Sequence, residues 1–123
     1  MRYIAVFLIG FVAAAPAAAQ NMPVSTFLEK ADKLRAKGAF ALFASDLRVL
    51  SREVESAAMI YSAERKADAA AGKPKDTCPP DKFKLGSDEI LNSFQSIPAD
   101  VRPHTSVKQA WALFFKRKFP CPK

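Results

Sequence analysis

Side chains that commonly build catalytic sites are scarce in this chain of 123 residues. It has one histidine, two cysteines and four scattered glycines. Acyl transfer usually needs a histidine base beside a nucleophile, and no serine, aspartate or cysteine stands at a motif spacing from His104. A zinc site needs three or four closely spaced ligands, and a phosphate loop needs clustered glycines. We therefore expect no enzymatic activity, no metal and no cofactor.

Signals for β-strands are missing as well. The sequence has no run in which apolar and polar residues alternate, and no Asn-Gly or Asp-Gly turn. Apolar residues instead recur at steps of three and four, which is the spacing of one face of a helix. The predicted fold class is all-α: a small single-domain helical bundle of four or five helices with one disulfide.

The N-terminus has the pattern of a secretory signal peptide. A positive start is followed by the apolar residues 4–12, broken by one glycine, and by the small residues Ala17 to Ala19. The apolar run is shorter than the roughly 20 residues of a membrane anchor. We predict that residues 1–19 are removed near Ala19, and that residues 20–123 form a single domain that is periplasmic or secreted.

The first half of this domain predicts two helical regions. Thr26 and Glu29 have the spacing of a capping box for a helix over Phe27–Lys37, and Gly38 is a plausible C-terminal cap for it. A heptad-spaced apolar series follows: Phe40, Phe43, Leu47, Leu50, Val54, Ala57 and Tyr61. We interpret this series as packing on the chain's own helices rather than as a dimerising coiled coil.

Two features of the heptad region concern its ends. Ser45-Asp46 has the character of a helix N-cap, so the sequence leaves open whether the helix from Ala39 to Ala71 is continuous or broken near Ser45. Beyond Tyr61 the heptad positions become Glu64 and Asp68. We expect these last two turns to project into solvent, because they have little apolar surface to bury.

Two shorter helices are predicted in the second half. Ser87 is expected to cap the first, which runs from about Asp88 to Ile97 and ends at Pro98. Ser106 and Gln109 have the spacing of a capping box for the second. Its apolar stripe is expected to form core: Val107, Ala110, Trp111, Phe114 and Phe115.

Cys78 and Cys121 are the only cysteines, and export would allow them to pair. A bridge between them would close a loop of about 44 residues and restrict the unfolded chain by about 4 kcal/mol. Three prolines keep the Gly72–Gly86 stretch from being helical. Its length suggests a functional or mobile surface.

The charge balance favours acidic partners. The formal net charge is +7, and loss of Arg2 with the signal peptide leaves +6. Anionic lipid and an acidic protein face are the expected kinds of partner; export makes nucleic acid the least expected, and we predict none. The disulfide would bring two groups of cations together: Lys73, Lys75, Lys82 and Lys84 from the loop, and Lys116, Arg117, Lys118 and Lys123 from the tail. This set is either a solvated rim that maintains solubility or a docking surface, and salt-sensitive binding would separate the two.

The C-terminal half resembles a known family. The resemblance rests on an ordered set of motifs over about residues 78–122: Cys78-Pro79, Ile90, Leu91 and Phe94, the Pro98–Arg102 loop, His104-Thr105-Ser106-Val107, and Phe114 through Phe119-Pro120-Cys121-Pro122. These motifs resemble the Rap/Tai family of type VI secretion immunity proteins, in which a Phe-Pro-Cys ends a helix-loop-helix unit and its cysteine pairs with an upstream one. The resemblance implies a periplasmic all-helical protein that blocks a peptidoglycan amidase by occupying its cleft, and it leaves a homodimer open.

The leading functional hypothesis is therefore a non-enzymatic immunity protein. Either the loop joined by Cys78 or the Pro98–His104 loop would enter the partner's cleft, and we expect Lys73, Lys75, Lys82, Lys84, His104, Lys116, Arg117 and Lys118 to contact the partner. The alternative is an envelope-associated module whose cations bind anionic lipid or an acidic protein surface. A small hydrolase is disfavoured by the missing base and nucleophile pair.

Overall fold

The computed structural model describes residues 22–122, which form four α-helices and two short 3-10 helices. In chain order these are α1 (Val24–Ala36), η2 (Gly38–Phe43), α2 (Ser45–Ala70), α3 (Ser87–Gln95), η3 (Arg102–His104) and α4 (Val107–Lys118). Between residues 22 and 122 there is no strand, only two isolated β-bridges. The all-α prediction is confirmed. The predicted signal peptide lies outside the described residues, and none of the described helices is long and apolar enough to cross a membrane.

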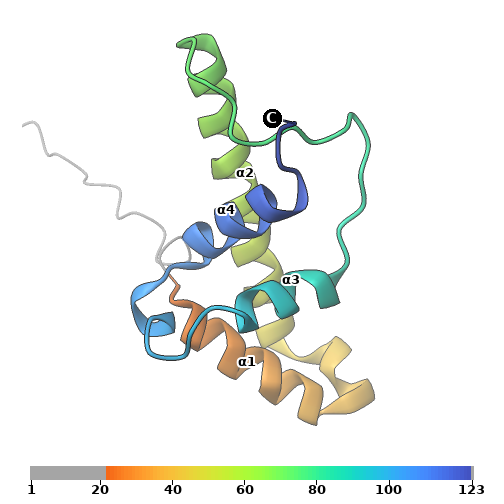
Figure 1. The fold of residues 1–123 in the computed structure, drawn as a ribbon. Helices are drawn as coiled ribbons and strands as arrows, with labels where there is room; N and C mark the ends of the chain where they lie inside the picture. Colours follow the sequence, from red (N-terminus) through yellow and green to blue (C-terminus); the bar gives the residue numbers. More distant parts are fainter. Residues whose placement is uncertain (1–21, 123) are drawn as a thin grey trace, which may run out of the picture.

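Helix α4 lies across the middle of the long helix α2, while α1 and α3 pack below it (Figure 1). Its apolar stripe is buried as predicted: Val107, Ala110, Trp111, Phe114 and Phe115. Burying a large apolar side chain of this kind contributes about 1.5–3 kcal/mol. The predicted capping box also forms, because the Ser106 hydroxyl accepts from the Gln109 amide (3.1 Å) and the Gln109 side chain accepts from the Ser106 amide (3.0 Å).

Helix α1 begins at Val24, three residues before the predicted start, and the Thr26–Glu29 capping box does not form. Backbone contacts with a distant part of the chain fix the start instead. The Val24 amide donates to the Thr105 carbonyl at 2.8 Å, and the Val107 amide donates to the Met22 carbonyl at 2.9 Å. At the other end Gly38 follows the last turn with φ +57°, so the predicted glycine cap is confirmed.

The helical region between residues 39 and 71 is broken. Ala44 has an extended backbone (ψ 136°) that separates η2 from α2. Ser45 is the first residue of α2 and its side chain caps nothing, so the predicted Ser45-Asp46 cap is wrong. Asp46 pairs with Lys30 of α1 instead, at 3.3 Å.

The heptad series is confirmed over most of α2. Leu50, Ala57 and Tyr61 are buried in a core shared with the chain's own α1 and α4, and Glu64 and Asp68 are exposed as expected. The last turns of α2 rise above the rest of the bundle (Figure 1). Phe40 is 77% exposed, so its assignment to the series is wrong; it lies before the break at Ala44.

Helix α3 starts after Gly86 and not through a Ser87 side-chain cap, which corrects that prediction. The Glu89 carboxylate accepts from the Gly86 amide at 3.1 Å. Phe94 is fully buried with its ring edge-on to Phe27, the centroids 5.3 Å apart. The helix ends at Gln95, where the Arg102 guanidinium donates to the Gln95 and Ile97 carbonyls at 2.6 and 2.8 Å.

Candidate functional site

The Cys78–Cys121 disulfide is present, with an S–S distance of 2.04 Å. It joins residues 72–86, hereafter the connecting segment, to the tail that follows α4. Beside it the Cys78 amide donates to the Phe119 carbonyl at 2.9 Å, and Thr77 forms an antiparallel bridge with Pro120. Two stretches of chain 43 positions apart are thereby held side by side.

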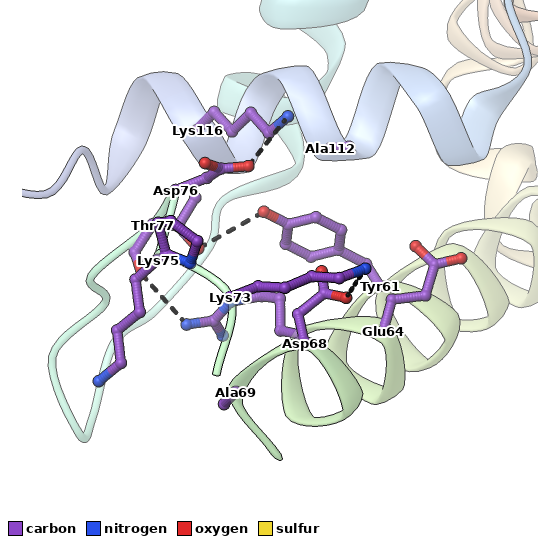
Figure 2. A pocket seen from close by; sticks show the side chains of 12 residues that line it. Tyr61, Glu64, Asp68, Ala69, Lys73, Lys75, Asp76, Thr77, Ala112 and Lys116 are labelled. Atoms are coloured by element: carbon purple, nitrogen blue, oxygen red, sulfur yellow. Dashed lines mark hydrogen bonds and ion pairs between the residues drawn. The ribbon is translucent and has the colours of Figure 1, made fainter. Parts of the chain in front are cut away.

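The upper turns of α2 hold the same point of the connecting segment through Thr77, which is buried. The Tyr61 hydroxyl lies 3.5 Å from the Thr77 hydroxyl (Figure 2). The Arg65 guanidinium donates to the Thr77 carbonyl at 3.4 Å and also lies over the Phe115 ring, 5.3 Å from its centroid. Arg65 therefore links the connecting segment to the aromatic core of α4.

Aromatic contacts form a second attachment beyond Pro79-Pro80. The Phe83 ring lies 4.7 Å from Phe119 and 5.8 Å from Phe115 between centroids. Phe83 is still 43% exposed. The connecting segment is thus fixed on both sides of its two adjacent prolines, and part of the Phe83 ring remains exposed to solvent.

A hollow of about 250 Å³ lies where α2, α4 and the connecting segment meet (Figure 2). Its charged lining residues are Glu64, Arg65, Asp68, Lys73, Lys75, Asp76 and Lys116. Lys73 pairs with Asp68 at 3.5 Å, and Lys116 pairs with Asp76 at 3.8 Å. Opposite charges therefore neutralise one another across the hollow. No histidine, cysteine or serine lines it, and among residues 22–122 no group of three His, Cys, Asp or Glu side chains is placed to hold a metal.

The predicted contact residues other than His104 fall into three groups. Lys73, Lys116 and Lys118 are in ion pairs, the last with Glu89. Arg117 donates to the Ser96 hydroxyl at 3.0 Å. Lys75, Lys82 and Lys84 are exposed, and within the described part of the chain none of them has a carboxylate within ion-pair distance. In Figure 2 the Lys75 side chain points away from the hollow.

His104 lies apart from these cations. It belongs to η3, which precedes α4 and packs on α1, whereas the disulfide follows the other end of α4. The 12 residues of α4 separate the two ends by about 18 Å. Of the predicted cations, Lys73, Lys75 and Lys116 therefore line one hollow near the disulfide, whereas His104 lies at the other end of α4. Lys123 lies outside the described residues.

Glu53 is a buried carboxylate that was not predicted from the sequence. It is 2% exposed, and its Oε2 has no hydrogen-bond partner among the described residues. Burial raises the pKa of Glu53, and a hydrogen bond from the Met22 backbone opposes that shift. Glu53 lies three residues after Leu50 and four before Ala57, so helical periodicity puts it on the same face as these buried residues. This spacing is the sequence feature that could have predicted its burial.

A second hollow, of about 430 Å³, lies between α1, α2 and α3. Its walls are mainly apolar, with residues such as Phe27, Leu50 and Ile90. The two charged residues on its lining, Arg35 and Glu55, are exposed. Its lining therefore differs from that of the hollow beside the disulfide, which is mainly charged.

Comparisons with family models, with curated proteins and with solved structures found no match to this chain.

Proposed function

We propose that this chain is an exported, non-enzymatic binding protein that blocks the cleft of a secreted peptidoglycan amidase, as an immunity protein does. The observation that carries the proposal is the double attachment of the connecting segment, at the Cys78–Cys121 disulfide and at the Phe83 ring. A loop fixed at two points loses little conformational freedom on docking, so more of its contact energy remains as affinity.

The distribution of charge also supports the connecting segment as the surface that contacts the partner. Lys75, Lys82 and Lys84 have no ion-pair partner among residues 22–122, while five other lysines do. Asp81, exposed beside Lys82, offsets part of this charge. Exposed cations of this kind steer an acidic partner and set its orientation.

Of the two candidate loops, the connecting segment fits this role better than Pro98–His104. Hydrogen bonds hold the latter in place as well, since Arg102 donates to the end of α3 and the Thr105 hydroxyl donates to the Val101 carbonyl at 2.8 Å. The two loops differ in charge, because Pro98–His104 carries no cluster of lysines. Occlusion by the connecting segment needs only that the loop enter the cleft while the bundle holds it in place.

The test uses exported peptidoglycan amidases encoded in the same genome. Each is expressed in the periplasm with and without this chain, and cell lysis is measured. Protection from lysis is expected for one of them, together with complex formation by calorimetry. Reduction of the disulfide should weaken that complex by about tenfold or more. Equal affinity of the oxidised and reduced proteins, or no protection by any pairing, would refute the proposal.

The alternative function, binding to anionic lipid, is favoured by one observation: an exposed aromatic ring stands between two lysines without ion-pair partners among the described residues. Sedimentation with phosphatidylglycerol and phosphatidylcholine vesicles separates the two functions. The immunity proposal expects equal, weak sedimentation with both, and a strong preference for the anionic vesicles would favour the lipid function.

A further inference from the structure

The surface around Phe83 combines an exposed aromatic ring with two exposed lysines that neighbour it in the sequence. Phe83 keeps 43% of its surface exposed, although it packs on two other rings. Lys82 and Lys84 flank it, and both are exposed without a carboxylate partner among the described residues. Aromatic side chains, Phe included, are enriched at the centres of protein interfaces.

The position of this ring is fixed before any partner arrives. Phe119, on which Phe83 packs, lies two residues before Cys121, and the Phe119 carbonyl accepts from the Cys78 amide. Phe119 also packs on Phe115 of α4, with the centroids 4.9 Å apart. Docking on Phe83 therefore does not have to order the ring, which removes a cost that binding usually carries.

We propose that Phe83 is the anchor of the docking surface, and that the partner is an acidic protein segment that presents an apolar side chain between carboxylates. The apolar side chain covers the exposed part of Phe83, and the carboxylates pair with Lys82 and Lys84. This inference rests on the proposed function for the class of partner, and it adds the chemistry that the partner must present.

A membrane fits the same surface less well. A ring that enters a lipid headgroup region has to protrude, whereas Phe83 lies against Phe119 and Phe115 with more than half of its surface covered. The neighbouring Asp81 also lowers the local positive charge. Stable attachment to anionic lipid needs a stronger basic cluster or a lipid chain.

The probes are two fluorescent acidic peptides that differ at one position. Both carry glutamates on either side of a central residue, which is leucine in one peptide and serine in the other. Anisotropy titrations with the oxidised protein, without the signal peptide, measure the two dissociation constants. The leucine peptide is expected to bind about tenfold more tightly, because only its apolar side chain can cover the exposed part of Phe83.

Matched variants test whether Phe83, Lys82 and Lys84 cause the preference for the leucine peptide. F83A should abolish the difference between the peptides, and F40A, which truncates a more exposed phenylalanine outside this surface, should keep it. K82E/K84E should weaken both peptides, whereas K33E/K66E makes the same charge change at exposed lysines of α1 and α2 and should weaken them much less. Circular dichroism confirms that each variant is folded; K82E/K84E leaves every ring contact in place and keeps the test decisive if F83A does not fold.

Equal affinity for the two peptides would overturn the inference, and so would equal losses in K82E/K84E and K33E/K66E. Preferential, Phe83-dependent binding to phosphatidylglycerol vesicles over the leucine peptide would overturn it in favour of a membrane. The fate of the proposed function is separate. If no amidase binds while the leucine peptide still binds through Phe83, the proposed function falls and this inference stands. If an amidase binds wild type and F83A equally, the inference falls and the proposed function stands.

Discussion

The two ends of α4 are held by different forces. Around its first turns Val107 and Trp111 are buried in one core with Val24 and Phe94, and a β-bridge between Pro23 and Ser106 joins the start of the helix to the start of α1. The last turn is held by the disulfide, one β-bridge, a group of aromatic rings and the contacts of Arg65. The covalent bridge therefore distinguishes the second end, where it fixes the position of the connecting segment against the tail.

The two hollows differ in the same way. The one between α1, α2 and α3 has mainly apolar walls, while the one beside the connecting segment is lined by charged residues that include the pairs Lys73–Asp68 and Lys116–Asp76. Ion pairs at an exposed surface contribute little to stability, but they fix side-chain positions and leave particular cations unpaired. Changes at the two ends should consequently have effects of different size and kind.

The largest effect is expected at the core end. Trp111→Ala removes a buried indole and should lower the free energy of unfolding by about 3–5 kcal/mol. Urea denaturation followed by circular dichroism measures it. Leu113→Ala on the same helix is the control, because Leu113 is 43% exposed and its truncation should cost about 0.5 kcal/mol or less. Similar losses for the two variants would contradict the assignment of the core.

The next effect concerns the disulfide end. Replacing both cysteines by serine, C78S/C121S, should destabilise the protein by about 2–4 kcal/mol, because the unfolded chain gains freedom over a long loop. Urea denaturation of this variant and of the reduced wild type should give the same midpoint. A midpoint unchanged from the oxidised protein would show that the bridge restrains nothing.

A smaller loss is expected from Arg65→Ala. It removes the bond to the Thr77 carbonyl and the contact with the Phe115 ring, together about 1–2 kcal/mol. Arg52→Ala, at an exposed arginine of the same helix, is the control and should change stability by about 0.5 kcal/mol or less. Thermal denaturation of the two variants measures the difference. Equal melting temperatures would contradict a stabilising role for the contacts of Arg65.

The smallest effect is a pH dependence at the core end. Burial raises the pKa of Glu53, so the folded state binds its proton more tightly than the unfolded state does. The stability from Glu53 is therefore fully present below the ordinary pKa near 4.5 and is lost as pH rises through the raised value. Glu53→Gln should remove this loss, so the stability difference between E53Q and wild type should grow in favour of the variant from acid to neutral pH.

Urea titrations at several pH values measure that difference. The pKa of Glu89 is lowered by Lys118 and the Gly86 amide, so its contribution to stability is lost as pH falls. Because Glu89 is present in both proteins, this contribution cancels in the difference between E53Q and wild type. Glu55→Gln, which makes the same change at an exposed carboxylate of α2, is the matched control. A flat difference between E53Q and wild type would contradict the burial of an ionisable Glu53.

The core was predictable because it follows spacing alone. The stripe from Val107 to Phe115 and the heptad positions from Leu50 to Tyr61 repeat at steps that any helix imposes. The caps at Thr26, Ser45 and Ser87 were predicted wrongly. The helix starts depend on contacts that local motifs do not contain, such as the bond from the Val24 amide to the Thr105 carbonyl.

The candidate site was predictable in part. The cysteine pair implied that the loop and the tail meet, and the disulfide confirms it. Which lysines remain unpaired depends on side-chain geometry, as in the pairing of Lys116 with Asp76, and no spacing rule gives that. The packing of Phe83 on Phe119 was not predicted from the sequence either. The one sequence feature that could have drawn attention to Phe83 is its position between two lysines in a polar loop.

Hydrogen exchange of the Cys78 amide tests the central claim most directly, because that amide donates to Phe119 only while the connecting segment lies against the tail. In the oxidised protein this amide should exchange slowly. After reduction it and the amides of the connecting segment should exchange faster, while those of Trp111 and Phe115 remain protected. A Cys78 amide that exchanges equally fast in both states would contradict the claim that the disulfide holds this segment as a rigid surface.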